Sequence, residues 1–262
     1  MKDRADGDGP PQKVAAIIAA RNDRRTVSAT VRACRAIPGV DLIIVVDDAS
    51  DDDTAQAARS AGAVVVRHSK ARGRASALET GVKVASMRDR ADWPARHLLF
   101  LDPDLGDSAI EAAPLVEAVV SGEADCAVGI SDHALEGAQG LGKLRSVGEG
   151  AAKLVRARTG WQPKDVMARE KCLTRAAVES VMPFAMRAAL DVAMTIDLLE
   201  HGFTVVEIPC DFDRVGPADG ERGSLRPRFG KTSFLLPVQM RWQTRRWRPG
   251  RRRPEGEATK SS

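Results

Sequence analysis

Two aspartates, Asp102 and Asp104, follow an apolar run in the stretch LLFLDPDLG at residues 98–106. In extended backbone, residues i and i+2 face the same side, so these two carboxylates can converge on one point. Pro103 restricts the residue before it to extended backbone and helps to hold that spacing. Two convergent carboxylates repel each other unless a cation or a proton lies between them. We therefore expect a positive charge close to this pair.

A divalent metal ion is the natural partner of two such carboxylates. Mg²⁺ and Mn²⁺ prefer oxygen ligands, and Mg²⁺ is often held by one or two carboxylates while water and substrate phosphates complete its shell. The pattern predicts a metal ion at Asp102 and Asp104 that in turn binds a phosphate. The alternative is that both aspartates only cap the end of a strand and the helix after it.

The segments around this pair alternate between two kinds of pattern. Apolar or β-branched runs typical of strands occupy residues 14–18, 42–46, 63–66, 98–101, 126–129 and 204–209. Segments of helical length and composition occupy residues 26–36, 53–61, 75–88, 109–121, 148–158, 174–182 and 187–201. This alternation predicts an α/β fold, with a mostly parallel sheet and helices on both faces.

The first four apolar runs are continuous, as in strands that are covered on both faces. Ligands of parallel sheets bind at the carboxyl ends of the strands, and the second run also ends in two acids, Asp47 and Asp48. Residues 131–147, with glycines at three positions, are expected to form a mobile loop.

The composition of the 262 residues, 43% hydrophobic and 29% charged, is that of an ordinary soluble globular protein. No apolar run approaches the roughly 18 residues of a membrane-spanning helix. The first residues lack the apolar core of a signal peptide, so we expect a cytoplasmic protein. The four cysteines are far apart in the sequence, which argues against a disulfide framework and a zinc cluster.

The net charge of +4 is unevenly distributed. Residues 241–253 carry seven arginines and no acid, so the rest of the chain has a net charge of −3. Arginines interleaved with tryptophan and leucine suit the surface of an anionic membrane. Nucleic-acid binding, which we regard as unlikely, and a solvated tail without a partner are the alternatives.

Four stretches in this order resemble family 2 glycosyltransferases of the GT-A type, the group that includes polyprenyl-phosphate sugar synthases. They are VAAIIAARND (14–23), LIIVVDDASDDDT (42–54), ARGRASALETG (71–81) and LLFLDPDLG (98–106). The resemblance implies a GT-A domain over residues 13–216, between a flexible N-terminus (1–12) and a basic, partly disordered tail (217–262). It implies transfer of a sugar from a nucleotide-diphospho sugar, with Mg²⁺ or Mn²⁺ as cofactor.

The resemblance also implies roles for individual residues. The nucleotide would meet a set of residues at the ends of the first strands and in the third stretch: Ala20, Asp23, Asp47, Asp48, Arg72, Arg74 and Asp102. The metal would be bound by Asp102, Asp104 and Asp213. Asp191 would be the catalytic base for a hydroxyl acceptor, or would only stabilise the dipole of its own helix. A phosphate acceptor, already anionic, would need no base.

Some positions depart from the family pattern. Ala19 and Arg21 replace the usual proline and aromatic residue, and Arg169 and Glu170 occupy a segment where a Ser-Gly pair is expected. The leading interpretation is a metal-dependent transferase that acts at the cytoplasmic membrane face on a lipid-phosphate or cell-envelope acceptor. A non-catalytic relative that binds a nucleotide or a partner protein, and a nucleotidyltransferase on a related fold, are the alternatives.

Overall fold

The first strand, β1 (Val14–Ala20), shows why its apolar run is continuous. Side chains of a strand alternate between the two faces of a sheet. Val14 and Ile18 belong to one hydrophobic core and Ala15 and Ile17 to the other, and all four are fully buried. The computed structural model describes residues 11–131, 142–185 and 190–215.

Six further strands pair with β1 in one seven-stranded sheet of order β3-β2-β1-β4-β6-β5-β7. They are β2 (Val40–Asp47), β3 (Val64–Arg67), β4 (His97–Leu101), β5 (Cys126–Ile130), β6 (Lys171–Leu173) and β7 (Val205–Pro209). All pairs are parallel except those of β6, which runs antiparallel to both β4 and β5. The prediction of a mostly parallel α/β sheet is confirmed.

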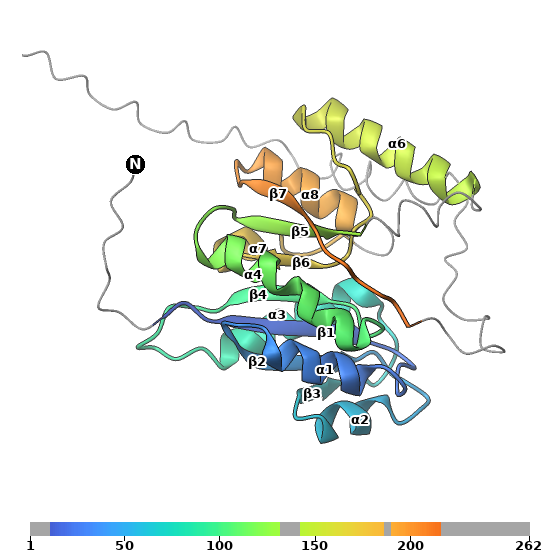
Figure 1. Cartoon of the computed structure of the whole chain (residues 1–262), viewed down its shortest axis with the longest axis vertical. Helices are drawn as coiled ribbons and strands as arrows, with labels where there is room; N and C mark the ends of the chain where they lie inside the picture. The colour runs from blue at the N-terminus through green and yellow to red at the C-terminus, as the bar shows by residue number, and fades with distance from the viewer. Residues whose placement is uncertain (1–10, 132–141, 186–189, 216–262) are drawn as a thin grey trace, which may run out of the picture.

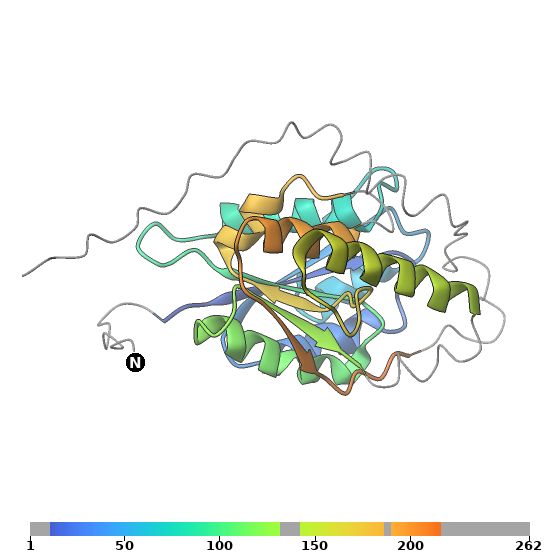
Figure 2. The ribbon, with the colours of Figure 1, turned by 90° about the horizontal axis from the view of Figure 1, so that it is seen from above.

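Helices cover both faces of the sheet (Figures 1 and 2). One face carries α1 (Val27–Ala36), α2 (Thr54–Ser60), the 3₁₀ helix η1 (Gly106–Ala112) and α4 (Ala113–Val120). The other face carries α3 (Arg74–Met87), α7 (Arg175–Val181) and α8 (Leu190–Glu200). A further helix, α6 (Gly142–Thr159), packs on α8 through a separate cluster that includes Val155 and Ile196.

The six predicted strands and the predicted helices are present, with three differences. β6 was not predicted, because three residues are too short for a hydrophobic pattern. The helix expected over 109–121 is a 3₁₀ helix followed by an α-helix that starts at Ala113. The expected loop at 131–147 is too long, because α6 begins at Gly142, and residues 132–141 lie outside the described ranges.

The predicted N-terminal and C-terminal tails also lie almost wholly outside the described residues. Among the helices of the described chain, none is both long enough and apolar enough to cross a membrane. The four cysteines are free and buried, in agreement with the absence of a disulfide framework.

Gly81 in α3 sets how closely that helix approaches the sheet. A Cβ atom at this position would lie 2.3 Å from Cγ2 of Ile17 on β1, far inside normal contact. Glycine costs a helix roughly 1 kcal/mol relative to alanine, and here the missing side chain allows close packing against β1.

We therefore expect Gly81→Ala to lower the free energy of unfolding by about 1–3 kcal/mol, because the added methyl group overpacks the core. Gly148→Ala is the matched control in α6, where a Cβ atom would meet nothing within 4 Å. It should stabilise the protein by up to about 1 kcal/mol. Urea unfolding of both variants measures the two effects. Equal stabilisation by both would show that β1 does not need the glycine.

Candidate active site

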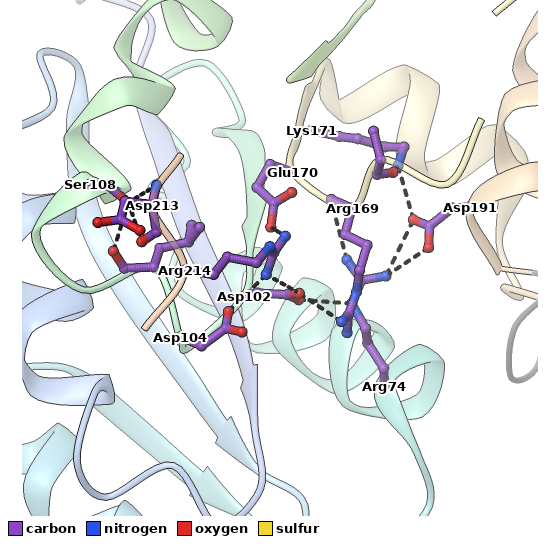
Figure 3. Close-up of polar contacts among 12 residues, drawn as sticks. Arg74, Asp102, Asp104, Ser108, Arg169, Glu170, Lys171, Asp191, Asp213 and Arg214 are labelled. Atoms are coloured by element: carbon purple, nitrogen blue, oxygen red, sulfur yellow. Dashed lines mark hydrogen bonds and ion pairs between the residues drawn. The ribbon is translucent and has the colours of Figure 1, made fainter. Parts of the chain in front are cut away.

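The strand β6 brings a charged segment to the carboxyl end of β4. Because β6 is antiparallel to β4, the residues that precede β6 lie beside the residues that follow β4. Lys171 pairs with Phe100, so Arg169 and Glu170 reach the neighbourhood of Asp102. Figure 3 shows the resulting cluster of side chains.

Asp102 is only 1% exposed and is surrounded by arginines. Its Oδ2 lies 2.8 Å from Nη1 of Arg169 and 3.0 Å from Nη1 of Arg214. Its Oδ1 lies 3.3 Å from Nε of Arg74, an ion-pair distance, yet neither atom has a hydrogen-bond partner. Burial alone would raise the pKa of Asp102, but the three guanidinium groups outweigh burial and lower it.

Asp104 converges with Asp102 on a single atom. Nη1 of Arg214 lies 2.8 Å from Oδ1 of Asp104 and also contacts Asp102 (Figure 3). The same guanidinium donates through Nη2 to Oε1 of Glu170 at 2.6 Å. The two carboxylates therefore meet a positive charge, as their spacing predicts, and in this structure that charge is an arginine.

Asp213 does not join the pair. Its backbone N–H donates to Oγ of Ser108, and the Ser108 hydroxyl donates to the carbonyl of Asp213, both at 3.0 Å. Within the described residues, no three His, Cys, Asp or Glu side chains are grouped so that they could hold a metal. The structure therefore brings together two of the three predicted metal ligands, Asp102 and Asp104, and Arg214, the residue after Asp213, points toward both of them.

Asp191, in the first turn of α8, is a buried member of the cluster. Its Oδ1 accepts a hydrogen bond from Nζ of Lys171 at 2.9 Å, and both oxygens lie 3.3 Å from Nη1 of Arg74. Nζ of Lys171 also donates to the carbonyl of Ala168. Arg74 therefore connects Asp191 to Asp102.

The surroundings of Asp191 make it a weak base. Burial raises its pKa, but Lys171 and Arg74 more than offset burial and lower the pKa to about 2. A general base works best when its pKa lies near the working pH. Asp191 is thus ionised, held by two cations and poorly suited to take up a proton in the free protein.

Asp48 organises the loop that precedes α3. Its Oδ1 accepts a hydrogen bond from the backbone N–H of Arg72 at 2.8 Å and lies 2.7 Å from Nδ1 of His68. Its Oδ2 accepts from the backbone N–H of Gly73 at 2.7 Å. Burial raises the pKa of Asp48, but these contacts together lower it. Nε2 of His68 reaches Thr80 at 2.9 Å, so this histidine is a buried structural residue.

The other predicted nucleotide residues take several positions. The carbonyl of Ala20 accepts a hydrogen bond from the backbone N–H of Asp48 at 2.9 Å. Asp47 is fully buried and accepts from the backbone N–H of Ser50 at 2.9 Å. Arg72 is exposed and joins the site only through its backbone, whereas Arg74 lies inside the charged cluster.

Asp23 belongs to the same electrostatic site. Its pKa is raised to about 6, first by burial and then by the negative charges of Asp104 and Asp102, against a backbone hydrogen bond from Arg21. The Arg21 N–H donates to Oδ2 of Asp23 at 2.6 Å. The ends of β1 and β4 therefore form one charged edge.

Sequence reasoning missed two members of the cluster. Arg214 follows Asp213, but a single arginine in an irregular segment carries no pattern. Lys171 lies in a strand too short to predict, and its side chain is only 2% exposed. Buried lysine is rare without a partner, so the partner Asp191 explains its place.

Asp23→Asn should stabilise the protein at neutral pH. A carboxyl whose pKa of about 6 in the folded protein exceeds its ordinary value of 3.8 costs stability as the pH rises between these two values. The two proteins should therefore unfold alike near pH 4 and differ by about 3 kcal/mol above pH 7, at roughly 1.4 kcal/mol for each pKa unit. Urea unfolding at each pH measures this gap, and a gap that does not change with pH would contradict the prediction.

Asp191→Asn should lower the free energy of unfolding by about 3–5 kcal/mol, because it leaves the buried ammonium of Lys171 without its counter-charge. Adding Lys171→Met to this variant should recover part of the loss. If Lys171→Met lowers the free energy of unfolding as much in the Asp191→Asn variant as in the parent protein, the two residues do not act as a pair. Denaturant unfolding of the four proteins of this cycle measures the coupling.

The fold resembles solved structures of one enzyme in particular. Glucosyl-3-phosphoglycerate synthase from Mycobacterium tuberculosis, in complex with Mg²⁺ and uridine diphosphate, aligns with a TM-score of 0.67 and 18% identity, over 88% of this chain and 79% of that chain. Its complex with Mn²⁺, uridine diphosphate and phosphoglyceric acid aligns with a TM-score of 0.66 and 18% identity, over 88% and 78%. At this identity the likeness shows the fold alone, which is the GT-A fold.

A mycobacterial protein of known structure aligns with a TM-score of 0.61 and 20% identity, over 79% of this chain and 69% of that chain. A search of curated proteins finds no match. The sequence model described as Glycosyl transferase family 2 matches residues 15–174, more than half of the chain. The chain therefore belongs to glycosyl transferase family 2 and is a glycosyltransferase.

Proposed function

We propose that the protein transfers a sugar from a nucleotide-diphospho sugar to the phosphate group of an acceptor, with a divalent metal ion as cofactor. The observation that carries this proposal is the convergence of Asp102 and Asp104 on one point, inside a ring of arginines at the carboxyl end of the sheet. The solved relatives that bind uridine diphosphate with Mg²⁺ or Mn²⁺ support the same donor chemistry.

The carboxylate pair suits a divalent ion. Both ligands are oxygen atoms, which Mg²⁺ and Mn²⁺ prefer. The buried Oδ1 of Asp102 lacks a hydrogen-bond partner, so one strong acceptor remains to be satisfied. When bound, such an ion would neutralise the negative charge that grows on the departing nucleoside diphosphate.

Arginines of the chain itself would supply the remaining positive charge. Arg74 is fixed by Asp102 and Asp191, so its guanidinium is already oriented before a donor binds. The side chain of Arg169 is 45% exposed beside the buried Asp102, and it can meet an incoming anion. Oriented charges that need no rearrangement contribute most to stabilising a transition state.

The acceptor we propose is a phosphate group, as in a lipid phosphate or a cell-envelope glycolipid at the cytoplasmic membrane face. A phosphate oxygen is anionic near neutral pH and needs no base. This agrees with the low pKa of Asp191, which makes that residue a poor proton acceptor. In this proposal Asp191 positions Arg74 instead of removing a proton, and the polyprenyl-phosphate sugar synthases are a functional analogy.

Thermal unfolding of the full chain with UDP, GDP or dTDP, each with and without Mn²⁺, tests the donor site. A nucleotide at 100 times its dissociation constant should add about 2.7 kcal/mol of stability. We expect one of the three nucleotides to raise the melting temperature, and only when Mn²⁺ is present. Asp104→Asn should abolish the shift, whereas Asp92→Asn, an exposed acid paired with Arg90 outside the site, should retain it.

The acceptor is tested by turnover with the sugar nucleotide that the first experiment selects. A polyprenyl phosphate in detergent and phosphoglyceric acid are offered in parallel, and release of nucleoside diphosphate is measured. Faster release with the lipid phosphate supports the proposal, and faster release with phosphoglyceric acid assigns a small hydroxyl acceptor. A folded protein that binds no nucleotide would favour the non-catalytic alternative.

A further inference from the structure

Arg214 occupies the point on which the two aspartates of the candidate metal site converge. A single nitrogen, Nη1, contacts Oδ2 of Asp102 at 3.0 Å and Oδ1 of Asp104 at 2.8 Å. The other terminal nitrogen contacts Glu170 at 2.6 Å. One guanidinium thus contacts three carboxylates, two of which are almost fully buried (Figure 3).

Within its ion pairs this cluster is balanced without any ligand, and Asp23 adds a further carboxylate nearby. Four carboxylates face four cations: Asp102, Asp104, Glu170 and Asp191 against Arg74, Arg169, Lys171 and Arg214. A divalent ion added to these eight paired groups would bring positive charge that they do not compensate, and it would repel the guanidinium. A metal ion and Arg214 therefore cannot share the aspartate pair at close range.

The position of Arg214 lets its side chain leave the aspartate pair. It lies beyond β7 in an irregular segment, and its side chain is 38% exposed. The backbone of this segment is tied down separately, since the N–H of Val215 donates to the carbonyl of Asp104 at 2.9 Å. The flexible stem of an arginine can thus turn outward while the main chain stays in place.

We propose that Arg214 is a resident cation that holds Asp102 and Asp104 in the metal-free protein and that a divalent ion must displace. The inference rests on the metal site of the proposed function. It follows that the free protein binds the metal weakly. A nucleotide-diphospho sugar strengthens metal binding, because its two negative charges balance those of the ion and give the released guanidinium a partner.

The test is the affinity of the nucleotide-free full chain for Mn²⁺, measured from the electron paramagnetic resonance signal of free Mn²⁺. Arg214→Gln should lower the dissociation constant at least about tenfold, a gain within the range of site-to-site coupling. Asp104→Asn in the same background should remove that gain. Arg90→Gln, which removes an exposed arginine from a pair with Asp92, is the matched control and should leave the affinity unchanged.

Stability gives a second readout. In EDTA the melting temperature of Arg214→Gln should fall below that of the parent protein, and Mn²⁺ should restore it. Mn²⁺ should shift the parent protein little. If Arg214→Gln does not fold, Arg214→Lys takes its place, since a single ammonium group cannot contact all three carboxylates and should compete less.

An Arg214 variant that binds Mn²⁺ no more tightly than the parent protein would overturn the inference and leave Arg214 a structural residue. This outcome is separate from a failure of the proposed function. If the parent protein binds uridine diphosphate with Mn²⁺ and the variant shows no gain, only the role of Arg214 fails. If the variant gains affinity for Mn²⁺ and no nucleotide binds, only the proposed function fails.

Discussion

The buried charge of Asp102 is the constraint on which the rest of the site depends. A carboxylate that is 1% exposed is costly to keep ionised, and the arginines around it offset that cost. They come from three different parts of the chain: the start of α3, the residues before β6 and the segment after β7. The charge of one aspartate therefore fixes where these three segments meet.

Much of the fold could be predicted from the sequence because its strands are buried on both faces. Continuous apolar runs such as 14–18 and 98–101 leave little doubt about a central strand, and acids at their ends mark the edge where ligands bind. The convergence of Asp102 and Asp104 also follows from spacing alone. These features are local, so the sequence around each one is sufficient to predict it.

The identity of the cation could not be predicted in this way. Arg214 is 110 residues away from Asp104 in the sequence. In the sheet β6 and β5 lie between β4 and β7, and the irregular segment after β7 crosses back to the end of β4, where the N–H of Val215 donates to the carbonyl of Asp104. The role of Asp191 could not be predicted either, because its position in the first turn of a helix fits both a catalytic base and a residue that stabilises the helix dipole. Its two cationic partners come from α3 and β6, and they decide its pKa.

The short strand β6 has a consequence for the sign of the charge at the site. Neighbouring residues of a strand point to opposite faces, so Glu170 reaches Arg214 while Lys171 reaches Asp191. Exchanging the two residues in the sequence, by Glu170→Lys together with Lys171→Glu, would exchange the two side chains between the faces. Lysine would then meet arginine and glutamate would meet aspartate, an inversion that turns two attractive contacts into two repulsive ones.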